Sequence, residues 1–392
     1  MNDGALFYPP FDHWLWYIPA IFIGACIGSF LNVVIYRVPL GLSVNEPKRS
    51  FCPHCKKPIP LKRNIPLVSW LMLRGKCADC GAPIAFRYFA VELLTALMFA
   101  AVWFVFPPIV VLPLWVMMAL VISITFIDAE HLIIPTGLTW AGSAAGLIGC
   151  ALWPQLPVMA GFAGDWKSGL IQGGIGWAVG FFGLWIVVEL GKKAFGKKAM
   201  KFDKPVEWMI KEPVGDQDPM LFVIDGEEIP WWDIFSRKTD RLIVEATDIR
   251  VNGESVMTGA GSPGNGLGQD APATLIIRET EIELPDGTIK KLEDVKSVDG
   301  TAISVVIPRE AMGMGDVHLL GMIGAFFGWT GVLFSLFAAS IFAIIAAVIG
   351  RIGFGRQLPF GPFLVMGMVA WMFGGWKLWQ WYISLLGPMG GL

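Results

Sequence analysis

Two aspartates and two glycines lie where apolar sequence meets polar sequence, and these residue types could support peptide hydrolysis. Asp128 closes one apolar stretch, and Asp316 opens another directly after Gly313-Met314-Gly315. Two carboxyl groups at one site can share a proton, which places an acid and a base together. Such a pair can activate water against a peptide carbonyl and protonate the departing amine. Gly313 and Gly315 lack a Cβ and would let a neighbouring helix or an extended substrate pass closely.

The same residues also have structural interpretations. Asp128 could be a helix-end residue that extends towards water, and Asp316 could cap the N-terminus of its helix. The glycines could be notches for helix packing. Spacing alone leaves the catalytic and the structural interpretations open.

Four cysteines form two CxxC pairs, Cys52-Pro-His-Cys55 and Cys77-Ala-Asp-Cys80. Each pair can supply two thiolates from one tight turn, so this spacing predicts a tetrahedral zinc site. Two disulfides or reduced structural thiols are the alternatives. A reducing cytoplasmic side disfavours the disulfides.

The elements that must position these residues are predicted to be transmembrane helices. The chain of 392 residues is 55% hydrophobic and 16% charged, against about 25% charged in an average soluble domain. This composition is typical of a multi-span membrane protein in a lipid bilayer and leaves no case for a nucleic-acid partner. Windows of roughly 20 apolar residues predict about eight transmembrane helices. They run over Trp14–Tyr36, Tyr88–Phe106, Ile109–Ile127, Leu138–Trp153, Gly169–Leu190, Met314–Trp329, Val332–Ile352 and Phe360–Leu386.

The distribution of basic residues predicts the orientation of these helices. Residues 37–87 hold ten Lys/Arg against two acidic residues, and a second basic cluster follows Leu190. Lys and Arg in short loops are retained on the cytoplasmic side. We therefore expect the N-terminus outside and both predicted catalytic aspartates at the cytoplasmic side.

Residues 192–307 change character and predict a small antiparallel β-rich domain inserted between two membrane helices. Short β-type runs are separated by Asp225-Gly226, Asn252-Gly253, Asp286-Gly287 and Asp299-Gly300, which favour tight hairpin turns. The predicted organisation has five parts. These are a first helix (1–37), a four-Cys loop (38–87), helices two to five (88–191), the inserted domain (192–307) and helices six to eight (308–392).

Several further stretches occur in a fixed order along the chain, and together with the cysteines and aspartates they resemble the type IV prepilin peptidases. These are membrane aspartyl proteases of the GxGD class. The resemblance covers nearly all of the chain outside residues 192–307. The additional stretches are Gly28-Ser29-Phe30-Leu31-Asn32-Val33-Val34-Ile35-Tyr36-Arg37, Asn64-Ile65-Pro66-Leu67-Val68-Ser69-Trp70-Leu71, Leu73-Arg74-Gly75-Lys76-Cys77, Arg87-Tyr88 and Val91-Glu92-Leu93-Leu94-Thr95-Ala96.

The resemblance implies a bifunctional enzyme of the bacterial inner membrane. Such enzymes remove the basic leader from type IV prepilins and type II secretion pseudopilins on the cytoplasmic side. They then methylate the new N-terminus with S-adenosylmethionine. By this resemblance Asp128 and Asp316 are the protease pair, and Cys52, Cys55, Cys77 and Cys80 form the metal loop. Glu92 lies in a family motif to which we assign no role from the sequence.

The chain departs from the family pattern in three respects. Thr136 follows Pro135 where many members have an aspartate, and His318 stands where many have a lysine. The insert at 192–307 is not part of the usual compact pattern. Two alternative functions stay open, a GxGD protease without methyltransferase activity and a non-enzymatic membrane scaffold with a zinc loop. No glycine-rich, strand-to-helix nucleotide loop is visible in the sequence, so methylation depends on the resemblance.

Overall fold

The structure contains a helical unit and a β-sheet unit. The computed structural model describes residues 14–47, 50–52, 54–154, 156, 165–195, 197–212, 220–235, 240–256, 272–308, 313–350 and 359–385. The chain divides into Met1–Ile186 with Met314–Leu392 as one unit, and Val187–Gly313 as the other.

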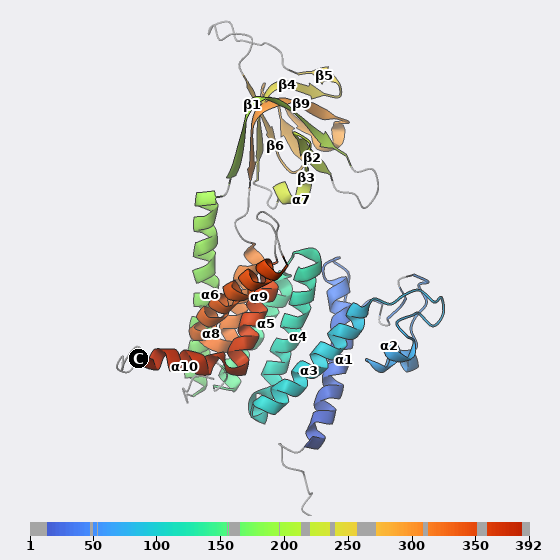
Figure 1. The fold of residues 1–392 in the computed structure, drawn as a ribbon, viewed down its shortest axis with the longest axis vertical. Helices are drawn as coiled ribbons and strands as arrows, with labels where there is room; N and C mark the ends of the chain where they lie inside the picture. Colours follow the sequence, from blue (N-terminus) through green and yellow to red (C-terminus); the bar gives the residue numbers. More distant parts are fainter. Residues whose placement is uncertain are drawn as a thin grey trace, which may run out of the picture. The chain divides into compact units, whose positions relative to one another are not determined.

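The helical unit is built mainly from long apolar helices (Figure 1). The four-Cys segment lies between α1 and α3, and a short helix, α2, lies within it. Another short helix, α7, belongs to the sheet unit. The bounds are α1 Tyr17–Arg37, α2 Val68–Met72, α3 Phe86–Val105, α4 Pro108–His131, α5 Thr136–Leu152, α6 Trp166–Phe195, α7 Trp231–Ile234, α8 Met314–Ile349, α9 Gly361–Ala370 and α10 Trp376–Leu385.

Within the described residues, five helices are long and apolar enough to cross a membrane. They make the chain a polytopic membrane protein, but they do not confirm the predicted count of eight spans. Helix α5 has 17 residues and is shorter than each of these five. The five spans are Trp14–Arg37, Phe86–Val105, Pro108–His131, Trp166–Lys192 and Met314–Ile349.

Backbone breaks at two glycines explain part of the difference between the eight predicted spans and the five long apolar helices. Gly328 interrupts α8 with φ 68° and ψ −177°, one residue before the end of the predicted sixth span, Met314–Trp329. Gly374 has φ 148° in a π-helical turn, Trp371–Gly375, that joins α9 to α10. Positive φ values of this kind favour glycine. The predicted last span, Phe360–Leu386, is therefore two short helices with a break between them.

Close packing of α6 against α8 also depends on glycine. A Cβ added to Gly176 would lie 2.2 Å from the backbone oxygen of Gly324, and one added to Gly324 would lie 2.1 Å from the oxygen of Gly176. Such close backbone approach between membrane helices requires small residues. This contact holds α8, which carries Asp316, against its neighbour.

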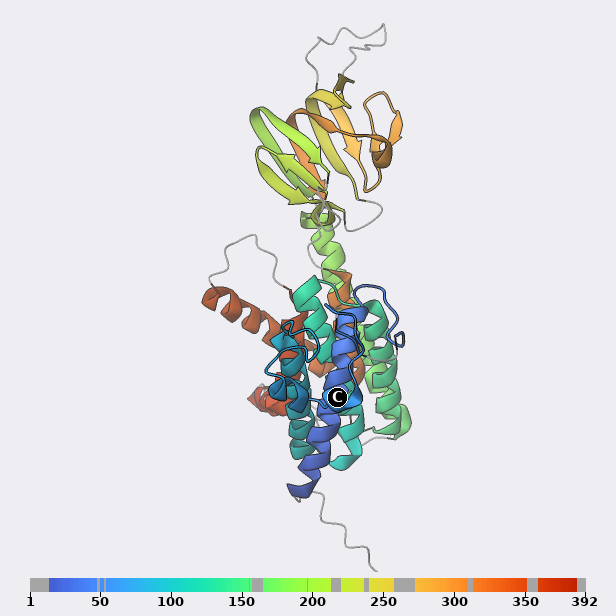
Figure 2. The same cartoon turned by 90° about the vertical axis from the view of Figure 1, so that its right-hand side faces the viewer.

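The sheet unit contains nine antiparallel strands within the described part of the chain. The strand order is β3-β2-β1-β9-β4-β6-β7-β8, and β5 pairs with β4. Figures 1 and 2 show the sheet strongly curved. The strands are β1 Lys197–Lys211, β2 Leu221–Ile224, β3 Glu227–Pro230, β4 Leu242–Val251, β5 Glu254–Ser255, β6 Ala273–Ile277, β7 Glu281–Glu283, β8 Ile289–Lys291 and β9 Val298–Pro308.

One apolar core is shared by strands from both halves of this sheet. Trp208 of β1 and Phe222 of β2 are buried with Val244 of β4, Leu275 of β6 and Val305 of β9 in the same cluster. Alternate residues of a strand point to the same face, and β9 shows this alternation of buried and less buried residues. The sheet unit therefore has its own hydrophobic core.

Three of the four predicted hairpin turns are confirmed. Asp225-Gly226 and Asn252-Gly253 have positive φ values at both residues, and Gly287 has φ 83°. These values match the turns that favour Asn-Gly and Asp-Gly dipeptides. The fourth prediction, at Asp299-Gly300, is wrong.

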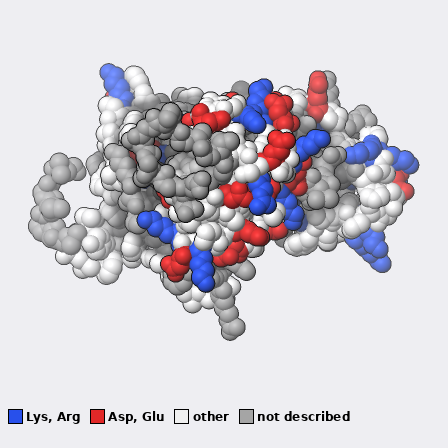
Figure 3. All heavy atoms as spheres, turned by 90° about the horizontal axis from the view of Figure 1, so that it is seen from above, with Lys and Arg blue, Asp and Glu red and all other residues white. Residues whose placement is uncertain are grey.

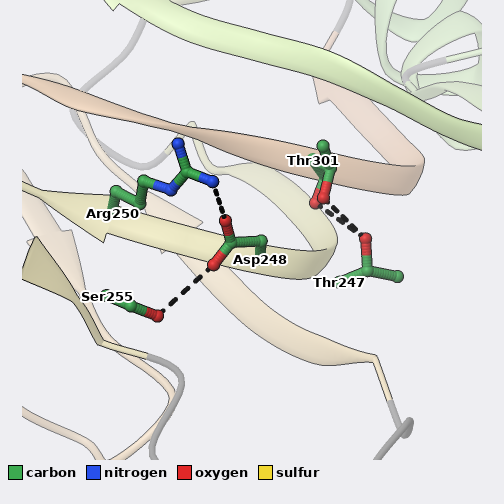
Figure 4. Close-up of polar contacts among 5 residues, drawn as sticks. All are labelled: Thr247, Asp248, Arg250, Ser255 and Thr301. Atoms are coloured by element: carbon green, nitrogen blue, oxygen red, sulfur yellow. Dashed lines mark hydrogen bonds and ion pairs between the residues drawn. The ribbon is translucent and has the colours of Figure 1, made fainter. Parts of the chain in front are cut away.

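Asp299 and Gly300 lie inside strand β9. Glycine is needed there for another reason, because a Cβ on Gly300 would lie 2.0 Å from the backbone oxygen of Asp248 in β4. The register of β4 and β9 is irregular just beside this contact. Figure 4 shows polar contacts between and along β4 and β9. Thr247 Oγ1 lies 2.8 Å from Thr301 Oγ1, and Arg250 Nη2 lies 2.8 Å from Asp248 Oδ2.

The exposed charges of the sheet unit are of both signs. Figure 3 shows acidic and basic side chains interspersed on the face that it displays. Ion pairs join some of them, as in Lys211 with Glu228 and Arg278 with Glu283. Mixed charge of this kind is typical of a water-exposed surface.

Candidate active site

Asp128 lies in the last turn of α4 and is 5% exposed. Its backbone oxygen accepts the N–H of Leu132, whose left-handed conformation ends the helix. Its side-chain Oδ2 is buried and has no hydrogen-bond partner among the described residues. This burial is inconsistent with a side chain that extends from a helix end into water.

Asp316 is the third residue of α8 and is 8% exposed. It lies inside the first turn, so it is not the residue that precedes and caps the helix. Its Oδ1 is buried and has no hydrogen-bond partner in the part of the chain that the structure describes. Gly313 precedes α8 and is exposed, and Gly315 lies within the first turn.

The two carboxyl groups lie in one neighbourhood. They are close enough to interact electrostatically. Ile134 connects the elements around them, because a Cβ on Gly315 would lie 2.7 Å from the Cβ of Ile134. The end of α4 and the start of α8 therefore meet at the two predicted catalytic residues.

Gly361, the first residue of α9, completes this neighbourhood, and the sequence motifs did not indicate it. Its backbone N–H interacts with the Asp128 carboxyl group. A Cβ at this position would lie 2.5 Å from Asp128 Oδ2 and 3.0 Å from Ile134 Cδ1. The signal in the sequence was a glycine before Pro362 at the start of the last predicted span, which by itself indicates only a helix start.

Such an arrangement can perform acid–base chemistry. Buried carboxyl groups without partners are unfavourable, and unpaired polar side chains in a membrane protein indicate functional sites. Two adjacent carboxyl groups can hold a water molecule between them, with one accepting its proton and the other donating a proton to a leaving group.

The four cysteines of the loop come together. Their Sγ atoms all lie within 4.8 Å of one another, and all four thiols are free. The Sγ atoms of Cys52 and Cys80 are 3.9 Å apart. The edge of a tetrahedron with Zn–S bonds of about 2.3 Å is about 3.8 Å. This group of thiols could therefore hold a tetrahedral metal ion, and disulfides are absent from it.

The two CxxC turns have the same backbone geometry. The N–H of Lys56 donates to the oxygen of Cys52 at 2.8 Å, and the N–H of Gly81 donates to the oxygen of Cys77 at 2.9 Å. Both donors have positive φ, 60° at Lys56 and 72° at Gly81. Two equivalent turns present two pairs of sulfur atoms to one point.

Backbone hydrogen bonds favour the thiolate at one of these cysteines. The N–H groups of Asp79 and Cys80 lower the pKa of the Cys77 thiol to about 7. The backbone N–H of Ala82 acts to lower the pKa of Cys80, but desolvation and the neighbouring thiols raise it to about 12. The environment therefore acts in opposite directions on the two thiols of this pair and favours the thiolate at Cys77.

Glu92 holds the four-Cys loop onto α3. Its Oε2 accepts a hydrogen bond of 2.7 Å from the N–H of Leu67, which precedes α2 with φ 62°. A Cβ on Gly28 of α1 would lie 2.7 Å from the Cα of Glu92. Glu92 therefore lies where α1, α3 and the loop meet, and its contacts assign it a positioning role that the sequence did not indicate.

The two departures from the family motifs have definite positions. Thr136 is the first residue of α5. The ring of His318 lies 5.4 Å from that of Trp140 and 5.1 Å from that of Phe181, measured between centroids. His318 therefore contacts the aromatic residues of α5 and α6.

Comparisons with protein families match both halves of the helical unit. Residues 22–106 match the Bacterial Peptidase A24 N-terminal domain. This range contains α1, the four-Cys loop and α3. Residues 297–348 match the type IV leader peptidase family, and this range contains Gly313, Gly315 and Asp316.

Comparisons with curated proteins find similar chains in several bacteria. The prepilin leader peptidase/N-methyltransferase of Myxococcus xanthus is 41% identical over 45% of this chain and 50% of its own length. The protein of the same name in Dichelobacter nodosus is 36% identical over 45% of this chain and 67% of its own length. The type 4 prepilin-like proteins leader peptide-processing enzyme of Escherichia coli is 38% identical over 44% of this chain and 69% of its own length.

The extent of these matches differs between relatives. The chain spans half the length of the Myxococcus xanthus protein and 57% of the corresponding Aeromonas hydrophila protein. No solved structure matches the chain.

Proposed function

Because the chain belongs to the type IV leader peptidase family, we propose that it is a membrane-embedded aspartyl endopeptidase that removes the basic leader from type IV prepilins or type II secretion pseudopilins. Asp128 and Asp316 are its catalytic pair, supported by Gly313 and Gly315. After cleavage, the same protein methylates the new N-terminus. The names of its relatives support both activities.

One observation carries the peptidase proposal. Asp128 and Asp316 are buried, interact electrostatically, and each keeps one carboxyl oxygen without a partner among the described residues. In the proposed reaction one carboxylate takes a proton from water as the water oxygen attacks the scissile carbonyl carbon. The other carboxyl group gives a proton to the peptide nitrogen as the C–N bond breaks.

The methylation part of the proposal concerns the amine that cleavage releases. The amine nitrogen forms a new N–C bond, the S–C bond of S-adenosylmethionine breaks with its electron pair left on sulfur, and the amine loses one proton. The described residues contain no glycine-rich turn between a strand and a helix that would resemble a nucleotide loop. Support for this activity therefore comes from the relatives' names.

We propose that Cys52, Cys55, Cys77 and Cys80 bind one structural zinc ion. The separation of their sulfur atoms and the two equivalent turns support this assignment. Four thiolates complete a tetrahedral site and leave no position for water or substrate. The ion would hold the loop in shape and take no part in bond cleavage.

We further propose that the protein spans the bacterial inner membrane with its N-terminus outside and its active site at the cytoplasmic side. The concentration of basic residues in 37–87 supports this orientation. An eight-span topology would count both parts of α8 and the broken segment 361–385 as crossings. A prepilin leader, which is basic, would then meet the site before export.

The test is product analysis with the full-length protein in liposomes. A prepilin with a basic leader and S-adenosylmethionine are added, and the product N-terminus is read by mass spectrometry. We expect a leaderless, methylated product. A leaderless but unmethylated product would support the protease without methyltransferase activity, and an intact prepilin would support the scaffold.

An Asp128→Asn variant separates the two activities in the same assay. It should leave the prepilin intact, yet methylate a synthetic pilin peptide that already lacks its leader. If the folded and inserted variant lost both activities, this would contradict the proposal that cleavage and methylation take place at two separate sites.

A further inference from the structure

A cavity of about 740 Å³ lies between the four-Cys loop and the ends of three membrane helices. Its volume is in the range of small-molecule sites, which is about 300–1,000 Å³. Neither Asp128 nor Asp316 lines it, so it is separate from the proposed peptidase pair. Its walls include Asn32 and Tyr36 of α1, Trp70 of the loop, Arg87 and Tyr88 of α3, and Glu130 of α4.

The cavity is close in sequence to the peptidase pair. Glu130 and His131 line it, and they follow Asp128 by two and three residues in the last turn of α4. The N–H of Leu132 closes that turn on the oxygen of Asp128. One helix end therefore contributes to both the catalytic neighbourhood and the cavity wall.

Two wall residues have buried polar atoms that lack a partner among the described residues. Asn32 is 3% exposed, and its Nδ2 donates to the backbone oxygens of Gly28 and Tyr88. These bonds orient the amide and leave Oδ1 without a donor. Arg87 pairs with Glu130, but its Nε is also without an acceptor. Buried polar groups are normally paired, so this wall holds two polar atoms, shielded from solvent, whose hydrogen-bonding capacity is not met.

The remaining walls suit a flat ring that carries groups of both charges. Trp70 packs against Phe89 at 5.1 Å between ring centroids, and its Nε1 donates to the oxygen of Ile84. Tyr36 is 38% exposed at the wall. Aromatic faces attract cations and stack with flat heterocycles. The same cavity is lined by groups of both charges, namely the carboxyl groups of Asp79, Glu92 and Glu130 and the guanidinium groups of Arg37, Arg63 and Arg87.

We propose that this cavity binds S-adenosylmethionine, an inference that rests on the methylation part of the proposed function. This ligand combines a purine ring, a sulfonium cation, an ammonium group and a carboxylate. Aromatic walls fit the ring and the sulfonium, charged wall groups of both signs fit its carboxylate and ammonium groups, and the position beside the last turn of α4 fits transfer to an amine released at Asp128. The four-Cys loop then forms one wall of the methyl-donor site.

The test is a binding measurement on the full-length protein in detergent with radiolabelled S-adenosylmethionine as the probe. Tyr36→Ala is compared with Phe30→Ala, since both side chains are exposed on α1 and only Tyr36 lines the cavity. We expect Tyr36→Ala to raise the Kd about tenfold, which corresponds to about 1.4 kcal/mol, and Phe30→Ala to leave it unchanged. Glu130→Gln, which removes one wall charge, should also weaken binding. Circular dichroism and thermal unfolding check that the variants are folded.

Ultraviolet cross-linking of the same probe gives an independent readout. Labelled peptides should come from α1, from the loop or from the first turns of α3. If the protein binds the probe but both cavity variants bind as tightly as wild type and the label maps to other helices, the cavity assignment is overturned while methylation stands. If wild type cleaves prepilin but binds no probe, methylation itself is overturned together with the cavity assignment.

Discussion

A carboxyl oxygen buried at a helix end without a partner is unfavourable for folding, by about 1–3 kcal/mol in mutational data. The chain carries two such oxygens in one neighbourhood, on Asp128 and Asp316. Proteins retain unfavourable groups of this kind where activity requires them. At the scale of single residues, this pair is the strongest argument for catalysis.

Substitution of Gly361 tests whether the reaction depends on the position of the Asp128 carboxyl group. In Gly361→Ala the new methyl group would lie 2.5 Å from Asp128 Oδ2, so the carboxyl group must move. A displacement of about 1 Å in an active site can lower the rate about a hundredfold. We expect cleavage of a prepilin peptide to fall by at least about tenfold, measured as initial rates in liposomes.

The matched control is Gly137→Ala at the start of α5, where a Cβ would have no neighbour within 4 Å. It should cleave at the wild-type rate. Equal rates for the two alanine variants would show that the carboxyl group of Asp128 does not depend on the space at Gly361.

Glu92 should act through the loop that it holds. Glu92→Ala leaves the N–H of Leu67 without its acceptor, and this should destabilise the loop by about 1–3 kcal/mol. Glu92→Gln keeps an oxygen in place and should behave nearly as wild type. The measurement is the rate at which a thiol reagent modifies the loop cysteines. If the loop cysteines were modified fast in both Glu92→Ala and Glu92→Gln, or fast in neither variant, a role of Glu92 through this hydrogen bond would be contradicted.

At the scale of elements, the two CxxC turns make the clearest prediction. Purified protein should contain about one zinc ion per chain, since four thiolates saturate one ion. Cys52→Ala should lose the metal, whereas Cys26→Ala, which changes an exposed cysteine of α1 outside the cluster, should retain it. Metal content is read by elemental analysis. A fully active preparation without any metal would rule out the structural zinc.

The sequence predicted some elements well and others poorly, for physical reasons. The CxxC spacing indicated that four sulfur atoms would gather, because each pair lies on one tight turn. Strand β1, Lys197–Lys211, was not predicted, because charged residues mask the alternating pattern of Phe202, Val206, Trp208 and Ile210. Asp299-Gly300 was misinterpreted as a turn because close approach between strands also selects glycine.

In the candidate site, too, the sequence could indicate some residues and not others. Asp128 and Asp316 could be selected as acidic residues at the ends of apolar stretches. Gly361 and Asn32 could not be selected in this way. The role of a single glycine or asparagine becomes visible only when its neighbours in space are known. The role of Glu92 likewise depends on Leu67, which is 25 residues away in the chain.

At the scale of the whole molecule, the sheet unit is an insertion whose two ends lie side by side. Lys197 of β1 pairs with Pro308 of β9 in the sheet, and paired residues in antiparallel strands have Cα atoms about 4.5–5.5 Å apart. A short linker can therefore replace the unit without pulling the membrane helices apart. The unit also has its own hydrophobic core.

We expect replacement of residues 192–307 by a short Gly/Ser linker to retain cleavage of a prepilin peptide, because Asp128 and Asp316 both lie in the helical unit. The isolated segment should give a β-type circular dichroism spectrum. A deletion protein that is correctly inserted but has no cleavage activity would show that the sheet unit takes part in catalysis. A helical spectrum for the isolated segment would contradict its independent folding.

The central claim is that Asp128 and Asp316 act as one catalytic pair, and single substitutions test it most directly. Asp128→Asn and Asp316→Asn keep nearly the same side-chain volume and remove the group that exchanges a proton. Turnover of a basic-leader prepilin peptide is measured in liposomes, with thermal unfolding as the check on folding. We predict that each folded variant loses at least about a hundredfold in rate, as expected when an acid or base is removed. Substantial turnover by either single variant would contradict the two-carboxylate mechanism.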